Sequence, residues 1–340
     1  MRIKYIDYLK GIGMLLVIVG HCGIPSPWWN YIYMFHLPLF FFVSGMVFNS
    51  RKCDIPWKNY LQDLFRKYVK PYVIFSLLGL LITMSFPKVY GIEPSYYQLG
   101  VYVSGIFVGR GEFAWTGNWG AIWYLLATFW LLVLAYIFGK KHRMFIYGVL
   151  CVVAPITSVY LMNYFSWQYG NGWIIWNIGA ALIAFPIFFL GNMFREMKQK
   201  LKNVPKIVFI FASIVLLVVG FLIAKDNTGI VAFANNGYGD LERMYVGALC
   251  IPLGLALCFD AIYDYSLVRL LGKPVEWIGR KTLLFLGIHG MTIPVVKLLV
   301  YKWFAYENWI LTAVLVLIVD TLFIVVYEYL KDRLIQIVGE

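Results

Sequence analysis

Three histidines lie inside apolar stretches of the sequence, where an ionisable side chain is costly: His21, His36 and His289. A neutral imidazole in an apolar site can accept a proton as a general base, so each is a candidate catalytic residue. We rank His21 first, because Lys10 lies 11 positions before it and that spacing puts both on one helix face, about 16 Å apart along the axis. The alternatives are a juxtamembrane pair of Lys10 with Asp7 and histidines that only make interior hydrogen bonds.

A metal site is another chemistry that histidines suggest. His36 follows an external turn that returns the chain beside His21, so we expect the two imidazoles to approach each other in the outer third of a bilayer. A zinc site usually needs three or four ligands, and no further ligand accompanies this pair at a suitable spacing. We therefore expect no metal.

Basic residues precede one of the apolar runs at close spacing. Arg66, Lys67 and Lys70 are followed directly by Pro71. Such cations either set the orientation of a membrane helix and bind anionic lipid, or hold a phosphorylated cosubstrate. Under the second interpretation, Lys10 would join them from the first helix.

The composition indicates what kind of fold must position these residues. Apolar residues make up 61% of the 340 residues and charged residues only 14%, which excludes an ordinary soluble domain. The apolar runs cover the whole chain, so residues 1–340 are expected to form a single membrane-embedded domain. The net charge of +12 does not indicate nucleic-acid binding, because the basic residues fall in short clusters between apolar runs rather than along one face.

The pattern predicts an all-α, polytopic bundle of about ten transmembrane helices. We place them near residues 6–22, 31–49, 69–86, 119–138, 144–162, 173–194, 206–224, 243–263, 282–301 and 309–330. Most Lys and Arg residues then fall in alternate connections, including 50–70 and 264–281, which makes both termini cytoplasmic. The stretch 99–109 is too short to span and is expected to be re-entrant or at the surface. Residues 1–23 are interpreted as a retained first helix rather than a signal peptide.

Several segments together resemble the integral-membrane acyltransferase family three, especially its fucose 4-O-acetylase-like branch. The most specific are the segment that begins with DYLKGIG at 7–13 and ends at His21, and FHLPLFFFVSG at 35–45. Weaker likenesses lie in Lys67 with KPY at 70–72, IWYL at 122–125, and IGRK at 278–281 followed by His289. Lys10 stands where the wider family commonly has Arg.

This resemblance implies a multi-pass, membrane-bound O-acyltransferase of a cell membrane, namely a bacterial plasma membrane. It would take an acetyl group, or a similar group such as succinyl, from acetyl-CoA as cytoplasmic cosubstrate. The acceptor would be a hydroxyl of a cell-surface or lipid-linked glycan. His21 would act as the base, assisted by His36, His289 and Lys10, while Lys10, Arg66, Lys67 and Lys70 would hold the donor. Contacts with the acceptor are expected from Trp123, Tyr124, Asn118 and Asn236. A transporter or flippase of a glycan or lipid-linked precursor is the alternative, and a homo-oligomer is left open.

Overall fold

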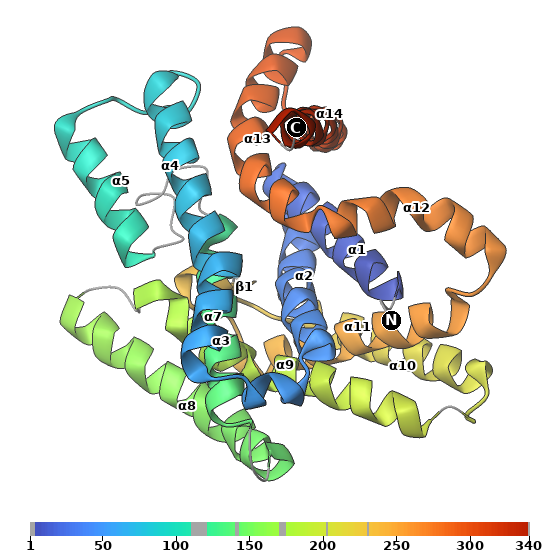
Figure 1. Ribbon diagram of the computed structural model, residues 1–340. Coiled ribbons are helices and arrows are strands. Elements are labelled where there is room, and N and C mark those ends of the chain that lie inside the picture. Colours follow the sequence, from blue (N-terminus) through green and yellow to red (C-terminus); the bar gives the residue numbers. More distant parts are fainter. Residues whose placement is uncertain are drawn as a thin grey trace.

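The computed structural model describes residues 4–109, 121–139, 143–169, 175–201, 203–229 and 231–338. These residues form an almost entirely helical bundle, which confirms the predicted all-α membrane fold (Figure 1). Within the described residues, eight helices are long and apolar enough to cross a membrane. Large apolar side chains are exposed along their outer faces, as expected for surfaces that contact lipid.

Each of the ten predicted spans corresponds to a helix. They are α1 (Lys4–His21), α2 (Ser26–Val47), α4 (Lys70–Ser85), α7 (Trp123–Ile137), α8 (Arg143–Tyr169), α9 (Ile178–Lys200), α10 (Lys206–Ala224), α11 (Leu241–Ile262), α13 (Thr282–Phe304) and α14 (Trp309–Val338). Two of them fall outside the set of eight. α1 carries Lys4, Asp7 and Lys10 within its 18 residues, and α7 has only 15 residues.

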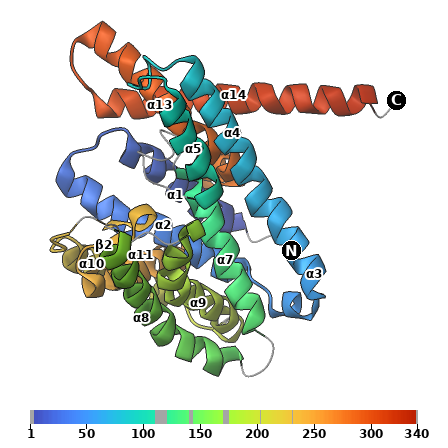
Figure 2. The same ribbon diagram turned by 90° about the vertical axis from the view of Figure 1, so that its left-hand side faces the viewer.

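The two ends of the bundle carry different elements. In Figure 2 both termini and α3 (Trp57–Leu64) lie toward the right, whereas the small β-hairpin and the α13–α14 turn lie toward the left. An even number of crossings gives this arrangement. It agrees with the predicted placement of both termini on one side.

A π-helical turn, Phe65–Val69, joins α3 to α4 without a break. The amide of Lys70 donates to the carbonyl of Phe65 in this turn. Pro71 follows, and its ring lacks an N–H and crowds the preceding turn, which favours a local widening of the helix. The turn therefore fixes the exposed cations Arg66, Lys67 and Lys70 at the end of a membrane helix.

The predicted connection 264–281 is instead largely an amphipathic helix, α12 (Ser266–Arg280). It packs along α1, and glycines permit the contact: a Cβ on Gly279 would lie 1.6 Å from the Asp7 carbonyl oxygen, and one on Gly11 would lie 2.0 Å from that of Val275. Small residues allow such close approach of helix backbones. The helix exposes Leu267, Leu270 and Leu271 on its other face, the pattern of a helix lying in a membrane interface.

Two segments on the side opposite the termini also fold back onto the bundle. The short stretch near 99–109 forms α5 (Tyr96–Val108), which lies beside α4, and the Tyr72 hydroxyl donates to the Ile106 carbonyl over 2.9 Å. Strands β1 (Val231–Ala232) and β2 (Gly237–Tyr238) form an antiparallel hairpin. The hairpin is anchored by Phe233, which is buried against Phe41 of α2.

Ion pairs join neighbouring helices near the end that holds the termini. Arg143 pairs with Glu196 between α8 and α9, Lys198 with Asp260 between α9 and α11, and Lys281 with Glu328 at the α13–α14 contact. The basic residues that indicated topology therefore also connect helices.

Candidate functional site

His21 and His289 lie next to each other, although they come from the first helix and from α13. Their ring centroids are 5.5 Å apart. No hydrogen bond joins the two rings in the part of the chain that the structure describes, and at this distance they are in ring contact. His289 is fully buried, whereas His21 is exposed at the end of α1. Of the two, His21 is the residue that a substrate can reach.

Tyr33 of α2 lies between His21 and His36. Its hydroxyl is 3.3 Å from Nδ1 of His21, and its ring centroid is 4.7 Å from that of His36. Gly20 makes this possible, because a Cβ there would lie 2.9 Å from the Tyr33 ring. The expected approach of His21 and His36 therefore takes place through a tyrosine.

Backbone carbonyls fix the protonation pattern of the two buried histidines. Nδ1 of His36 donates to the Ile32 carbonyl over 2.7 Å, and Nδ1 of His289 donates to the Phe285 carbonyl over 2.8 Å. A carbonyl can only accept, so the neutral ring must carry its hydrogen on Nδ1 and a lone pair on Nε2. In His289 this Nε2 is buried and has no hydrogen-bond partner among the described residues. It is therefore free to accept a proton or a hydrogen bond.

Lys10 lies on the same helix as His21 and pairs with Asp7, the pairing that the sequence left open as the alternative to a catalytic role. The distance from Nζ to Oδ1 is 3.0 Å, and the Lys10 side chain is 30% exposed while that of Asp7 is 3% exposed. This pair offsets the charge of Lys10 within a helix that enters the membrane.

The other predicted cations lie at the α3–α4 junction, where Arg66, Lys67 and Lys70 are all exposed. Lys67 pairs with Asp63 over 2.8 Å. Lys52, in the short 3-10 helix η1 (Ser50–Asp54), belongs to the same region. Burial lowers the pKa of Lys52, and the charges of Lys67 and Arg195 lower it further while Asp63 opposes the shift. This excess of positive charge favours an anionic ligand.

The residues expected to contact the acceptor are placed differently. Trp123 and Asn236 are buried within the protein, and Asn236 accepts a hydrogen bond from the Tyr238 hydroxyl over 3.1 Å. Tyr124 is half-buried and packs on Phe41, with ring centroids 5.1 Å apart. Asn118 lies outside the described residues. No described hydrogen bond or ring contact joins Trp123, Tyr124 or Asn236 to His21.

Sequence reasoning missed three polar residues near the histidines: Tyr33, Lys297 and Asp320. Asp320 of α14 is fully buried, and its Oδ1 accepts from the Thr292 hydroxyl over 2.8 Å. Lys297 lies on α13 two turns beyond His289. Lys297 and Asp320 both interrupt apolar runs of the sequence. Because burying a charge in a membrane is costly, this position could have identified them as candidate site residues. Tyr33 gave no such signal among the many aromatic residues of α2.

Comparisons with known proteins extend this picture. The nodulation protein NolL of Sinorhizobium fredii (strain NBRC 101917 / NGR234) is 25% identical to the chain over 214 residues, which are 58% of this chain and 50% of NolL. The chain thus spans about half the length of this curated relative. The acyltransferase domain family Acyl_transf_3 matches residues 3–329, a range that includes all three histidines. Because that match covers nearly the whole sequence, the chain belongs to this acyltransferase family.

Proposed function

We propose that the protein transfers an acetyl or similar acyl group from cytoplasmic acyl-CoA to a hydroxyl of an extracytoplasmic or lipid-linked sugar. The observation that carries the proposal is the pairing of His21 with His289 at a centroid distance of 5.5 Å. Membership of an acyltransferase family supports the class of reaction. The fucose 4-O-acetylase-like branch remains a prediction from the sequence motifs, as does the identity of the sugar.

In the proposed reaction, the acceptor hydroxyl lies between His21 and His289. Nε2 of His21 takes the hydroxyl proton while the oxygen attacks the thioester carbonyl carbon. For this, His21 donates its Nδ1 hydrogen to the Tyr33 oxygen, a contact of 3.3 Å. A C–O bond forms and the C–S bond breaks. The thiolate of coenzyme A leaves and takes the proton from His21.

The sequence left open how His289 assists His21. Its hydrogen bond to the backbone excludes one such role, donation to an oxyanion. Its Nδ1 hydrogen is committed to the Phe285 carbonyl, so neutral His289 has no hydrogen left to donate to an oxyanion. Its Nε2 lone pair can instead orient the acceptor hydroxyl or stabilise protonated His21. His36, which is similarly bonded to Ile32, positions Tyr33 by ring contact.

The donor would enter at the end of the bundle that holds the termini. Arg66, Lys67 and Lys70 are proposed to hold the phosphates of coenzyme A, together with Lys52 and with Lys10 at the inner end of α1. Lysine binds phosphate as a point charge, so several lysines from different elements can share one ligand. The support for this site is the positive charge that Lys52, Lys67 and Arg195 concentrate around η1.

The proposal is tested with purified protein in sealed proteoliposomes, acyl-CoA carrying a labelled acyl group, and glycans extracted from the source cell envelope. Wild-type protein should form an ester on the glycan and release one thiol per ester, and a His21→Ala variant should do neither. Movement of an unmodified glycan across the bilayer without thiol release would replace the enzyme by a transporter.

A further inference from the structure

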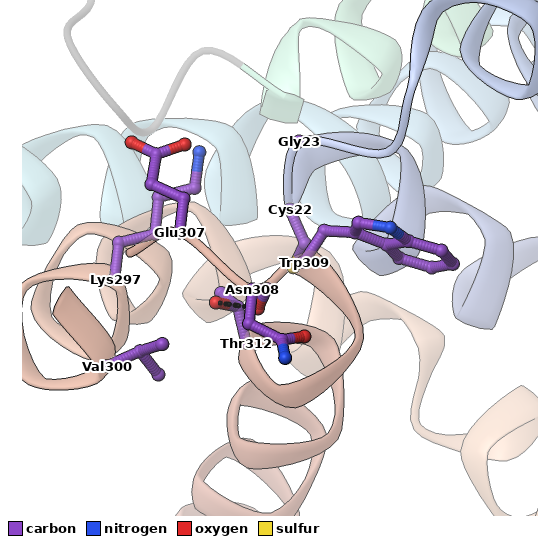
Figure 3. A pocket seen from close by; sticks show the side chains of 8 residues that line it. All are labelled: Cys22, Gly23, Lys297, Val300, Glu307, Asn308, Trp309 and Thr312. Carbon is purple, nitrogen blue, oxygen red and sulfur yellow. Dashed lines mark hydrogen bonds between the residues drawn. The ribbon is translucent and has the colours of Figure 1, made fainter. Parts of the chain in front are cut away.

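A small pocket opens just beyond the end of α1, between the α1–α2 turn, the outer half of α13 and the first turn of α14 (Figure 3). It has a volume of about 120 Å³, enough for a phosphate or carboxylate group together with water. Cys22 and Gly23, which line it, directly follow His21. A group bound in this pocket is therefore adjacent to the proposed catalytic base.

Lys297 supplies the charge of the pocket. Its ammonium group would lie 3.7 Å from a Cβ on Gly23, so it reaches the turn that follows His21. The side chain is half-buried in a helix that spans the membrane. It makes no hydrogen bond or ion pair with any residue that the structure describes. An uncompensated cation at membrane depth is costly, and an anionic ligand would offset that cost.

The remaining lining residues fit such a ligand. α14 begins at Trp309 and runs for 30 residues, so the positive end of its helix dipole lies at the pocket. Asn308 caps this end, because its Oδ1 accepts from the Leu311 amide over 3.0 Å. The Thr312 hydroxyl is used within the protein, because it donates to the Asn308 carbonyl over 2.8 Å. Glu307 is the one carboxylate among the lining residues. It is exposed and lies at the same edge of the pocket as Lys297 in Figure 3, but the structure shows no ion pair between these two described residues.

We propose that this pocket binds an anionic group of the acyl acceptor, with Lys297 as its counter-ion, so that the acceptor is a phosphate- or carboxylate-bearing molecule. The identification of the ligand as the acceptor rests on the proposed acyl transfer. The binding of an anion does not. A hydroxyl on the same molecule is then placed at His21, which explains how one site selects both the molecule and the atom to be acylated.

The test measures binding by calorimetry on the full-length protein in nanodiscs, with glucose-1-phosphate, methyl glucoside and a polyprenyl phosphate as probes. Glucose-1-phosphate should bind the wild type more tightly than methyl glucoside. Lys297→Gln should lower the affinity for the two phosphate probes about tenfold, the size expected for losing one charged hydrogen bond. The affinity for methyl glucoside should be unchanged. Lys297→Arg should restore binding. Lys302→Gln, which removes an exposed charge from the same helix, should match the wild type.

Binding of the polyprenyl phosphate alone would show that the pocket recognises a lipid-linked acceptor. Binding of both phosphates would show that it recognises the phosphate group whatever carries it. The proposal is overturned if neither phosphate binds, if Lys297→Gln changes nothing, or if it weakens the neutral sugar equally. If the wild type binds phosphate through Lys297 but never transfers an acyl group, the proposed function is wrong and the anion site is supported.

Discussion

The Nδ1 atom of His21 lies 3.3 Å from the Tyr33 hydroxyl, and this contact connects the end of α1 to the middle of α2. Tyr33 also stacks on Trp29, with ring centroids 4.2 Å apart. Stacking on Trp29 of the same helix therefore fixes the Tyr33 ring, and the Tyr33 hydroxyl in turn orients His21. An exposed histidine at a helix end gains a defined orientation in this way, which a catalytic base needs.

Loss of this base should stop the reaction without unfolding the protein. We expect His21→Ala to lower kcat by about 10²- to 10⁴-fold, the usual contribution of general-base catalysis. Size-exclusion profiles should be unchanged because the side chain is exposed. Tyr33→Phe keeps the ring packing and should cost less. Near-normal turnover by a well-folded His21→Ala variant would remove His21 from the mechanism.

The two histidines of the pair should act as a unit. His289→Gln removes the Nε2 lone pair beside His21 and is expected to reduce kcat. Combined with His21→Ala it should add little, because residues that serve one step are not additive. A double-mutant cycle on kcat measures this. Fully multiplicative losses would mean that His289 works independently of His21.

Donor binding should depend on the cations at the α3–α4 junction. Replacing both Lys67 and Lys70 by Gln is expected to raise KM for acyl-CoA about tenfold or more, with little change in acceptor preference. Lys88→Gln, in the connection on the opposite side, removes an exposed charge as a control. Equal effects of the two changes would point to general electrostatics rather than a donor site.

The pH dependence of donor binding should report on Lys52. Because burial and neighbouring cations hold the pKa of Lys52 below its ordinary value, this amine loses its charge at a lower pH than an ordinary lysine does. Attraction of phosphate is present below that pKa and is lost above it. KM for acyl-CoA should therefore rise with pH in a range where an ordinary lysine, with a pKa of about 10.4, is still charged. Lys52→Arg, which stays charged, should flatten that rise, and an unchanged profile would exclude Lys52.

The close contact of α1 with α12 should tolerate no side chain at Gly279. A Cβ there meets the Asp7 carbonyl oxygen at 1.6 Å, so Gly279→Ala must separate the helices and is expected to lower thermal stability. Overpacking of this kind typically costs about 1–3 kcal/mol. Gly148→Ala in α8 is the matched control, since a Cβ there meets nothing within 4 Å. Similar melting temperatures for both variants would contradict the packing.

The sequence predicted the long helices well because the requirement for an apolar span is local. The runs that became α10 and α13 are recognisable from a few turns of chain. The segments 50–70 and 264–281 were expected to be connections because their charges are those of cytoplasmic loops. Yet α12 is helical, because its apolar face packs on α1 and meets the membrane interface, a context that no local rule contains.

The site was predictable in part for the same reason. Costly intramembrane histidines identified His21, His36 and His289, but the proximity of His21 to His289 depends on how α13 packs against α1. Lys297 and Asp320 are as costly as the histidines, and the same rule applied to every charge in an apolar run would have included them. Tyr33 is different, because only the absence of a side chain at Gly20 makes its position possible.

The hydrogen bond from His289 to the Phe285 carbonyl has a consequence for the path of protons. An imidazole with two free nitrogens can receive a proton on one and release a different proton from the other, which makes it a relay. In His289 one nitrogen is permanently occupied, so any proton that arrives at Nε2 must depart from Nε2. His289 therefore cannot relay a proton from one ring nitrogen to the other. A proton bound at Nε2 can leave only toward His21.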